Sequence, residues 1–102
     1  MTHIQELRDT IHGLHGGKAS HLESVPITEV FKGQTVWDGI VEVFLLEGHP
    51  KTDRVYAWRH ETGDPDKPWR HVTVLHIPPV VSPQTAVKAA IVQEFREHGK
   101  AN

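Results

Sequence analysis

Residues 36–46, which read VWDGIVEVFLL, hold the strongest strand signal in the chain. β-Branched and aromatic side chains dominate them, and such side chains fit a pleated sheet well. Two more strands are predicted at Arg54–His60 and Arg70–Ile77, separated by a cluster of turn formers at residues 62–68. Gly48-His49-Pro50 separates the first of these strands from residues 36–46. Because the connections are short, we expect the three strands to be antiparallel neighbours.

The N-terminal part of the chain predicts a helix followed by an ambiguous segment. Thr2 and Gln5 have the spacing of a capping box, and Gly16-Gly17 ends the helix. The apolar side chains of this helix recur at spacings of three and four, at Ile4, Leu7, Ile11 and Leu14. Residues 18–35 alternate only in part, so whether they form a fourth strand stays open. Pro26 restricts such a strand to the edge of the sheet.

A second helix follows the strands. Ser82 is its predicted N-cap, Pro83 takes its first position, and Gly99 is its predicted end. Its apolar stripe is Val87, Ala90, Ile91 and Phe95. Together these elements predict a single α+β domain over residues 1–102, with a three- to four-stranded antiparallel sheet in the order α-(β)-β-β-β-α. We expect both helices to cover mainly one face of the sheet.

The composition excludes several classes of function. The 102 residues include no Cys, which removes disulfide frameworks, thiolate zinc sites and thiol nucleophiles. With 11 Lys+Arg against 13 Asp+Glu, the formal net charge is -2, so the chain is not a polybasic binder of nucleic acids or membranes. Neither a secretory signal nor a membrane-spanning apolar run is found, which predicts a cytoplasmic protein. We expect no cofactor.

A simple hairpin register predicts one aromatic face of the sheet. If each connection is centred on its turn residues, Phe44 lies opposite Tyr56, and His60 lies opposite His71. This face then carries Glu42, Phe44, Tyr56, Trp58, His60 and His71. The opposite face is aliphatic, and we assign it to the core under the helices: Val41, Val43, Leu45, Val55, Ala57, Val72 and Val74.

The aromatic face is too apolar to be left in water by so small a domain. We therefore expect a binding or assembly module, in which Phe44, Tyr56 and Trp58 anchor a homodimer or another protein partner. Two alternatives remain. The first helix, residues 18–35 or the C-terminus could fold over the face, or the face could form a pocket for a small ligand.

Glu42, His60 and His71 carry the alternative chemistry on this face. Their residue types suit an acid/base pair, or a zinc or ferrous site, although no compact motif such as His-Glu-x-x-His is present. A small enzyme or ligand-binding protein using these three residues is therefore an alternative to assembly, and metal binding by the trio ranks below it. No Ser lies in a Gly-x-Ser-x-Gly elbow, so an enzyme is less expected than a binding module.

A further alternative is binding of nucleic acid. Residues 82–90, SPQTAVKAA, and Gly48-His49-Pro50 are similar in layout to the second helix and an inter-strand loop of the double-stranded-RNA-binding domain. The resemblance covers about residues 36–97 and implies that domain's topology and its RNA partner. The paired lysines of that family are replaced here by residues 83–85, which leaves Lys88 alone. Because duplex affinity rests on several phosphate contacts, we expect a shared topology rather than RNA binding.

Overall fold

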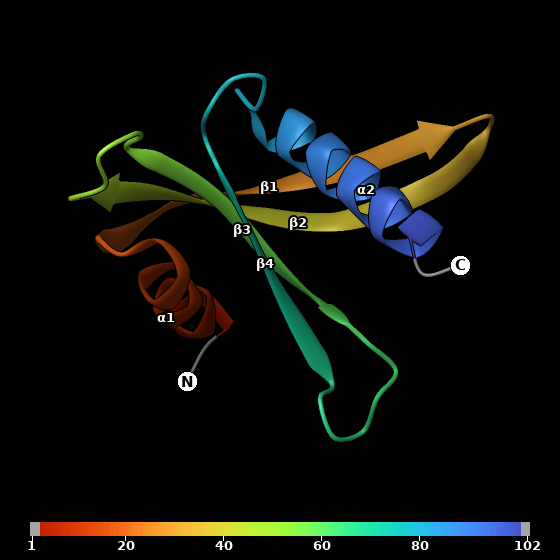
Figure 1. Ribbon diagram of the computed structural model, residues 1–102, viewed down its shortest axis with the longest axis horizontal. Helices are drawn as coiled ribbons and strands as arrows, with labels where there is room; N and C mark the ends of the chain where they lie inside the picture. The colour runs from red at the N-terminus through yellow and green to blue at the C-terminus, as the bar shows by residue number, and fades with distance from the viewer. Residues whose placement is uncertain (1–2, 101–102) are drawn as a thin grey trace.

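The chain folds into a four-stranded antiparallel sheet with two helices (Figure 1). This computed structural model describes residues 3–100, with side chains described as far as residue 94. In chain order the elements are α1 (His3–His15), β1 (Lys18–Phe31), β2 (Gln34–Glu47), β3 (Arg54–Glu61), β4 (Trp69–Leu75) and α2 (Pro83–Lys100). The strands lie side by side in the order β1-β2-β3-β4. The α+β class and the element order are confirmed, and residues 18–31 form a fourth strand at the sheet edge.

Glycines end α1 as its sequence predicts. Gly16 and Gly17 have positive φ values of 74° and 75°. A Cβ on Gly17 would lie 2.4 Å from the carbonyl oxygen of Glu47, so the turn from α1 into β1 requires glycine there. Leu14 is 66% exposed, so the buried stripe of α1 stops at Ile11. The expected capping residue, Thr2, lies outside the described residues.

The start of α2 is also as predicted, but its end is not. Ser82 caps the helix, because its Oγ accepts a hydrogen bond from the Thr85 amide at 3.2 Å. The helix continues past Gly99 to Lys100, so that glycine does not end it. The side chain of Phe95, predicted to extend the apolar stripe, lies outside the described side chains. No described helix is both long and apolar enough to cross a membrane.

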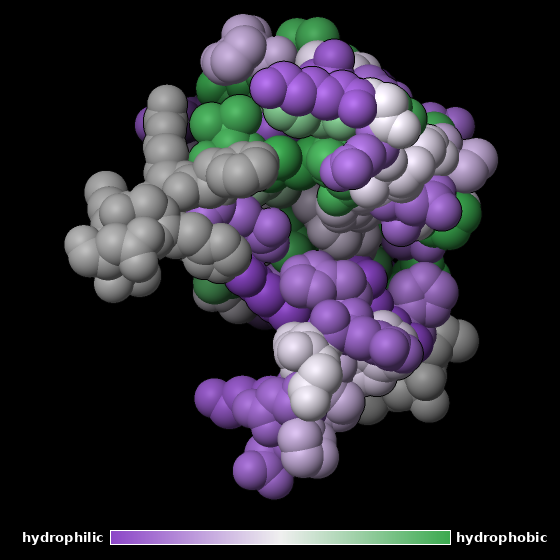
Figure 2. Space-filling model, turned by 90° about the vertical axis from the view of Figure 1, so that its right-hand side faces the viewer, coloured by the Kyte–Doolittle hydropathy of each residue, from purple (hydrophilic) through white to green (hydrophobic). Residues whose placement is uncertain are grey.

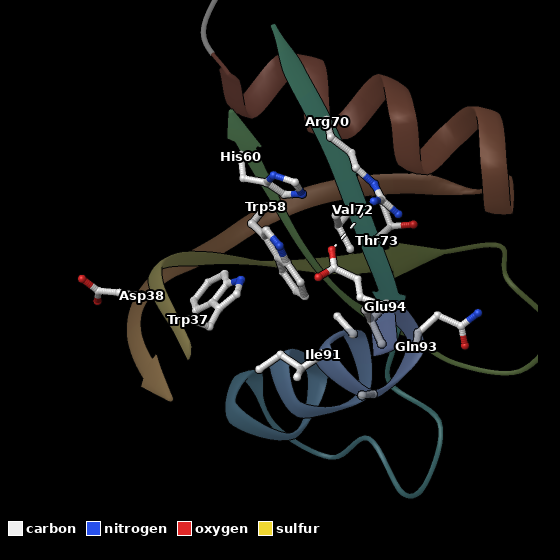
Figure 3. A pocket seen from close by; sticks show the side chains of 13 residues that line it. Trp37, Asp38, Trp58, His60, Arg70, Val72, Thr73, Ile91, Gln93 and Glu94 are labelled. Carbon is white, nitrogen blue, oxygen red and sulfur yellow. Dashed lines mark ion pairs between the residues drawn. The ribbon is translucent and has the colours of Figure 1, made fainter. Parts of the chain in front are cut away.

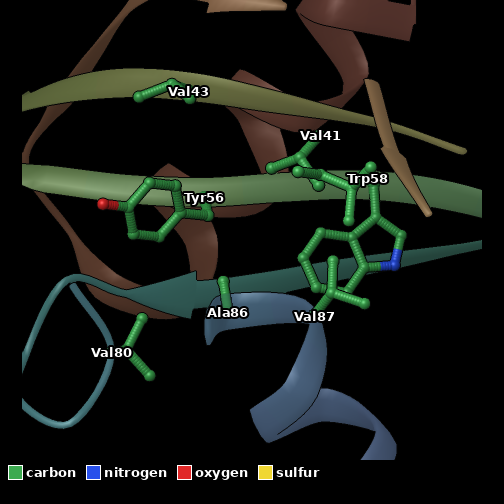
Figure 4. Close-up of a cluster of buried hydrophobic side chains, with 8 residues drawn as sticks. Val41, Val43, Tyr56, Trp58, Val80, Ala86 and Val87 are labelled. Atoms are coloured by element: carbon green, nitrogen blue, oxygen red, sulfur yellow. The ribbon is translucent and has the colours of Figure 1, made fainter. Parts of the chain in front are cut away.

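Each face of the sheet has its own buried apolar cluster. On the face covered by α2, here the α2 face, the buried members are Ile27, Val41, Val43, Tyr56, Trp58, Val80, Ala86 and Val87 (Figure 4). On the face covered by α1, here the α1 face, they are Leu7, Ile11, Ala19, Phe44, Leu46, Val55 and Ala57. Val55 and Tyr56 are neighbours in β3 but belong to different clusters, because successive side chains of a strand point to opposite faces.

The two helices therefore lie on opposite faces, which corrects the expectation that both cover mainly one face. The sequence of β2 explains the difference. Val41 and Val43 make one of its faces apolar, while Phe44 and Leu46 make the other apolar, and all four are buried. Each face then needs a helix to cover it. Figure 1 shows α1 and α2 against different ends of the long β1–β2 pair.

Strand β3 is turned over relative to the predicted register. Tyr56 pairs with Val43 rather than with Phe44, and the β3–β4 pairing is likewise displaced by one residue. A slip of one residue exchanges the faces of a strand, and the second slip restores β4 to its predicted orientation. Tyr56 and Trp58 thus lie on the α2 face, whereas Val55 and Ala57 lie on the α1 face.

The β2–β3 connection accounts for the first slip. A hydrogen bond of 2.7 Å from the Leu46 amide to the Asp53 carbonyl oxygen closes this connection, and Leu45 pairs with Arg54. The loop is therefore centred between His49 and Pro50. The predicted pairing of Phe44 with Tyr56 is centred on Pro50, half a residue away. Leu45, which the predicted register assigned to the core, is 40% exposed.

A bulge allows β1 to contribute to both clusters. The register with β2 shifts between His21 and Glu23, so Leu22 has no residue opposite it. The extra residue changes which face the following side chains occupy. Ala19 is consequently buried on the α1 face, while Ile27, an even number of residues further along, is buried on the α2 face.

Candidate functional site

A cavity lies between α2 and the sheet. It has a volume of about 510 Å³ and is lined by β2, β3, β4 and α2. The side chains that shape it include Trp37, Trp58, His60, Arg70, Ile91 and Glu94 (Figure 3). We call it the α2 cavity. Its volume lies within the range of small-molecule binding sites.

Two indole rings form an aromatic wall of the α2 cavity. Trp37 of β2 lies an even number of residues before Val41 and therefore on the same face, and Trp58 belongs to the α2-face cluster. Their ring centroids are 5.5 Å apart, with the ring planes at 74°, which is an edge-to-face contact. Trp58 is only 3% exposed and Trp37 is half-buried, so packing holds both rings in place before any ligand arrives.

The polar side chains of the cavity come from β3, β4 and α2. His60 and Arg70 are cross-strand partners on the α2 face. The Arg70 guanidinium lies 3.7 Å from the Glu94 carboxylate, beyond hydrogen-bonding distance, and both side chains are about half exposed. Such an exposed ion pair stabilises little. The Nδ1–H of His60 donates to the carbonyl oxygen of Glu61 at 3.2 Å, so Nε2 of the neutral ring is an acceptor.

A second polar group surrounds Glu42 on the α1 face. Its buried carboxylate accepts hydrogen bonds from His21 Nε2 at 3.0 Å, from His3 Nε2 at 3.3 Å and from the Ser24 hydroxyl. Burial raises the pKa of Glu42. The three hydrogen bonds and the nearby His21 lower it by more than burial raises it, so the pKa lies below its ordinary value. The ionised carboxylate connects α1, β1 and β2.

The structure separates the predicted trio of Glu42, His60 and His71. His60 lies on the α2 face, whereas Glu42 and His71 lie on the α1 face, and His71 pairs with Arg59 rather than with His60. His71 Nε2 is buried without a hydrogen-bond partner among the described atoms, 3.7 Å from a carboxylate oxygen of Glu6. No three His, Asp or Glu side chains in the described part of the chain are placed to hold a metal ion.

The predicted aromatic anchors are also divided between the two faces. Phe44 is buried against α1, with its ring centroid 5.4 Å from that of His21, whereas Tyr56 and Trp58 are buried under α2. The helices of the same chain cover all three rings. This agrees with the alternative in which part of the chain folds over the aromatic side chains. Of the predicted site residues, Trp58 and His60 line the α2 cavity.

Sequence reasoning overlooked Trp37, Arg70 and Glu94 at the α2 cavity, and His3, His21 and Ser24 around Glu42. Trp37 lies in the strongest strand stretch, and its even spacing from Val41 would have placed it on the same face. A carboxylate inside that apolar stretch, Glu42, needs hydrogen-bond donors if the strand is buried, which is the signal that could have directed attention to nearby histidines.

Comparisons with protein-family models, with curated proteins and with solved structures find no match for this chain. The order expected from the RNA-binding resemblance has three strands between the helices, whereas the structure has four. The functional conclusion therefore depends on the geometry of the α2 cavity.

Proposed function

We propose that this protein binds a small, flat, largely apolar molecule in the α2 cavity. The observation that carries the proposal is the pair of firmly held indole rings, Trp37 and Trp58, beside about 510 Å³ of space. Small-molecule sites are concave and mostly apolar, with a few polar groups that orient the ligand. His60 and Arg70 are such groups here.

The placement of Glu42 favours binding over catalysis. This carboxylate has the residue type of a general base, but it belongs to the α1 face and already accepts hydrogen bonds from His3, His21 and Ser24. It is not directed at a molecule in the α2 cavity. A general base must come within hydrogen-bonding reach of the proton it removes.

Calorimetric titration with 2-naphthol, an uncharged bicyclic probe, tests the proposal. We expect a dissociation constant on the order of 10⁻⁴ M, from about 0.5 kcal/mol per non-hydrogen atom. Ala90→Leu extends a side chain of α2 into the cavity and should abolish binding. Val92→Leu is the matched control, because Val92 is 49% exposed on the same helix. Equal binding by the wild type and Ala90→Leu would show that the probe does not occupy this cavity.

Ala90→Leu is a better test than removal of an indole ring. Trp58 lies in the α2-face cluster, and truncating such a side chain to Ala costs about 3 to 5 kcal/mol of folding stability. Lost binding by Trp58→Ala would therefore report unfolding as readily as a lost contact. Filling the cavity leaves the cluster itself intact.

Self-association is the second candidate function, and apolar side chains at the β1–β2 turn favour it. Val30, Phe31 and Val36 are 59%, 63% and 44% exposed. Figure 2 faces the end of the molecule where this turn lies and shows hydrophobic side chains among hydrophilic ones in its upper part. Exposed apolar patches commonly mark interaction surfaces. We propose a homodimer through this end rather than through the covered aromatic rings.

Sedimentation over about 1 to 100 µM protein tests the homodimer. A rise in mean mass that Phe31→Ser abolishes supports it. Leu14→Ser is the control, because Leu14 is 66% exposed at the end of α1. Monomer at every concentration contradicts self-association without affecting the ligand proposal.

A further inference from the structure

The α2 cavity holds one permanent cation among its described side chains, and that cation is weakly paired. Arg70 lies 3.7 Å from Glu94, and 51% and 48% of the two side chains are exposed. Asp38 borders the cavity, but its carboxylate points away from it (Figure 3) and accepts a hydrogen bond from Thr28 at 3.0 Å. The guanidinium is therefore the group at this site most able to accept an anionic partner.

We propose that the ligand of the α2 cavity is an apolar carboxylic acid, with its flat body against the indole rings and its carboxylate on Arg70. This inference rests on the proposed function and adds the chemical class of the ligand. Guanidinium and carboxylate form bidentate, charge-assisted hydrogen bonds, which are about twice as strong as neutral ones.

The charge balance favours a carboxylate over a phosphate. Arg70 offers a single positive charge, whereas a neutral His60 ring adds none. One carboxylate matches this charge when Glu94 turns away. A doubly charged phosphate would leave excess negative charge beside Glu94. The His60 Nε2 acceptor also suits a hydroxyl group on the ligand.

Glu94 acts as a weak competitor for the same guanidinium. Its distance from Arg70 and its exposure mean that little stability is lost when an incoming carboxylate displaces it. Removal of the Glu94 charge should therefore strengthen binding of an acid. It should leave binding of an uncharged analogue unchanged.

Calorimetry with two matched probes, 2-naphthoate and 2-naphthol, tests this inference near neutral pH. The probes share one ring system and differ in the carboxylate, which is ionised at that pH. We expect wild-type protein to bind 2-naphthoate a few-fold more tightly, because the Arg70 side chain is half exposed and solvent screens its pairing with the carboxylate. Arg70→Gln should remove this preference, because it weakens 2-naphthoate much more than 2-naphthol. Glu94→Gln should tighten 2-naphthoate a few-fold.

Lys88→Gln is the matched control, since it removes one positive charge from an exposed position on α2 that does not line the cavity. It should leave the binding of both probes unchanged. Equal affinity of wild-type protein for both probes overturns the carboxylate inference and leaves the proposed function standing. Equal weakening of both probes by Arg70→Gln also overturns it, because Arg70 would then act on the fold. Failure of both probes to bind overturns the proposed function itself.

Discussion

At the residue scale, Glu42 shows how a single buried charge is accommodated. The residue is 3% exposed, and His3, His21 and Ser24 supply the donors that replace water around its carboxylate. These donors come from α1 and from β1, the strand that pairs with β2. The hydrogen bonds around Glu42 therefore form only when α1 and β1 pack against β2.

Glu42→Gln should lower the free energy of unfolding by about 1 to 3 kcal/mol near neutral pH. The amide retains one acceptor oxygen but places an N–H₂ group against donors that need an acceptor. Urea denaturation measures the change. Glu47→Gln is the control, because Glu47 is exposed on the same strand, and it should change the free energy little.

The effect of Glu42→Gln should also depend on pH. The pKa of Glu42 is lowered in the folded protein from an ordinary value of 4.5. A lowered folded pKa contributes stability that is fully present above the ordinary value and is lost as the pH falls through the folded pKa. The difference between wild type and variant should thus persist from neutral pH to about pH 5 and shrink at lower pH. A difference that keeps growing as the pH falls below 4.5 would falsify this assignment.

At the element scale, the two cores depend on how each strand distributes its side chains. The Leu22 bulge changes the orientation of β1 part of the way along, and the loop centred between His49 and Pro50 turns β3 over. Neither feature alters the hydrophobic pattern in an obvious way. Both decide which side chains meet which helix.

Deletion of Leu22 should destabilise the protein far more than Leu22→Ala. Without the extra residue, either Ala19 or Ile27 must turn to the wrong face. Exposing a side chain such as Ile27 costs about 1.5 to 3 kcal/mol, and the other side chains turned with it add to that cost. Leu22 itself is 48% exposed, so its truncation should cost no more than about 0.5 kcal/mol. Urea denaturation of the two variants, followed by circular dichroism, measures both changes. Similar stabilities would contradict a register role for the bulge.

Helix α1 offers a matched pair of leucines. Leu7 is 0% exposed against the sheet, whereas Leu14 is 66% exposed in the last turn. Leu7→Ala should cost about 2 to 5 kcal/mol, because it leaves a cavity in the α1-face cluster. Leu14→Ala should leave the free energy of unfolding nearly unchanged. Equal costs for the two changes would mean that α1 does not dock as described.

At the scale of the whole molecule, the two clusters share the same strands. Val55 and Tyr56 are bonded neighbours in β3, yet each belongs to a different cluster. One cluster cannot lose its strands while the other keeps them. We therefore expect a single cooperative unfolding transition, as small domains commonly show.

Leu7→Ala tests this coupling across the sheet. The substitution lies under α1, and in a Trp69→Phe background the fluorescence comes from Trp37 and Trp58 on the α2 side, because Trp69 lies on the α1 face. Tryptophan fluorescence and circular dichroism should shift to lower urea by the same amount. A fluorescence midpoint that stays at the wild-type value while the circular dichroism midpoint moves would show that the two sides unfold separately.

The sequence by itself determined the elements, because strand composition, helix periodicity and turn residues are local properties. The strand at residues 36–46, the end of α1 at Gly16-Gly17 and the start of α2 at Ser82 were predictable for that reason. It also placed most side chains of β2 and β4 on the correct faces. The α2 cavity was only partly visible, through Trp58 and His60.

Only the tertiary structure decided which faces meet. The placement of α1 and α2 on opposite sides depends on both faces of β2 being apolar, and the partners of Glu42 come from α1 and β1. Strand β3 is turned over because the centre of the β2–β3 loop lies half a residue away from the predicted centre. Side chains alternate with a period of two, so a displacement too small to change the strand pattern exchanges the faces of a whole strand.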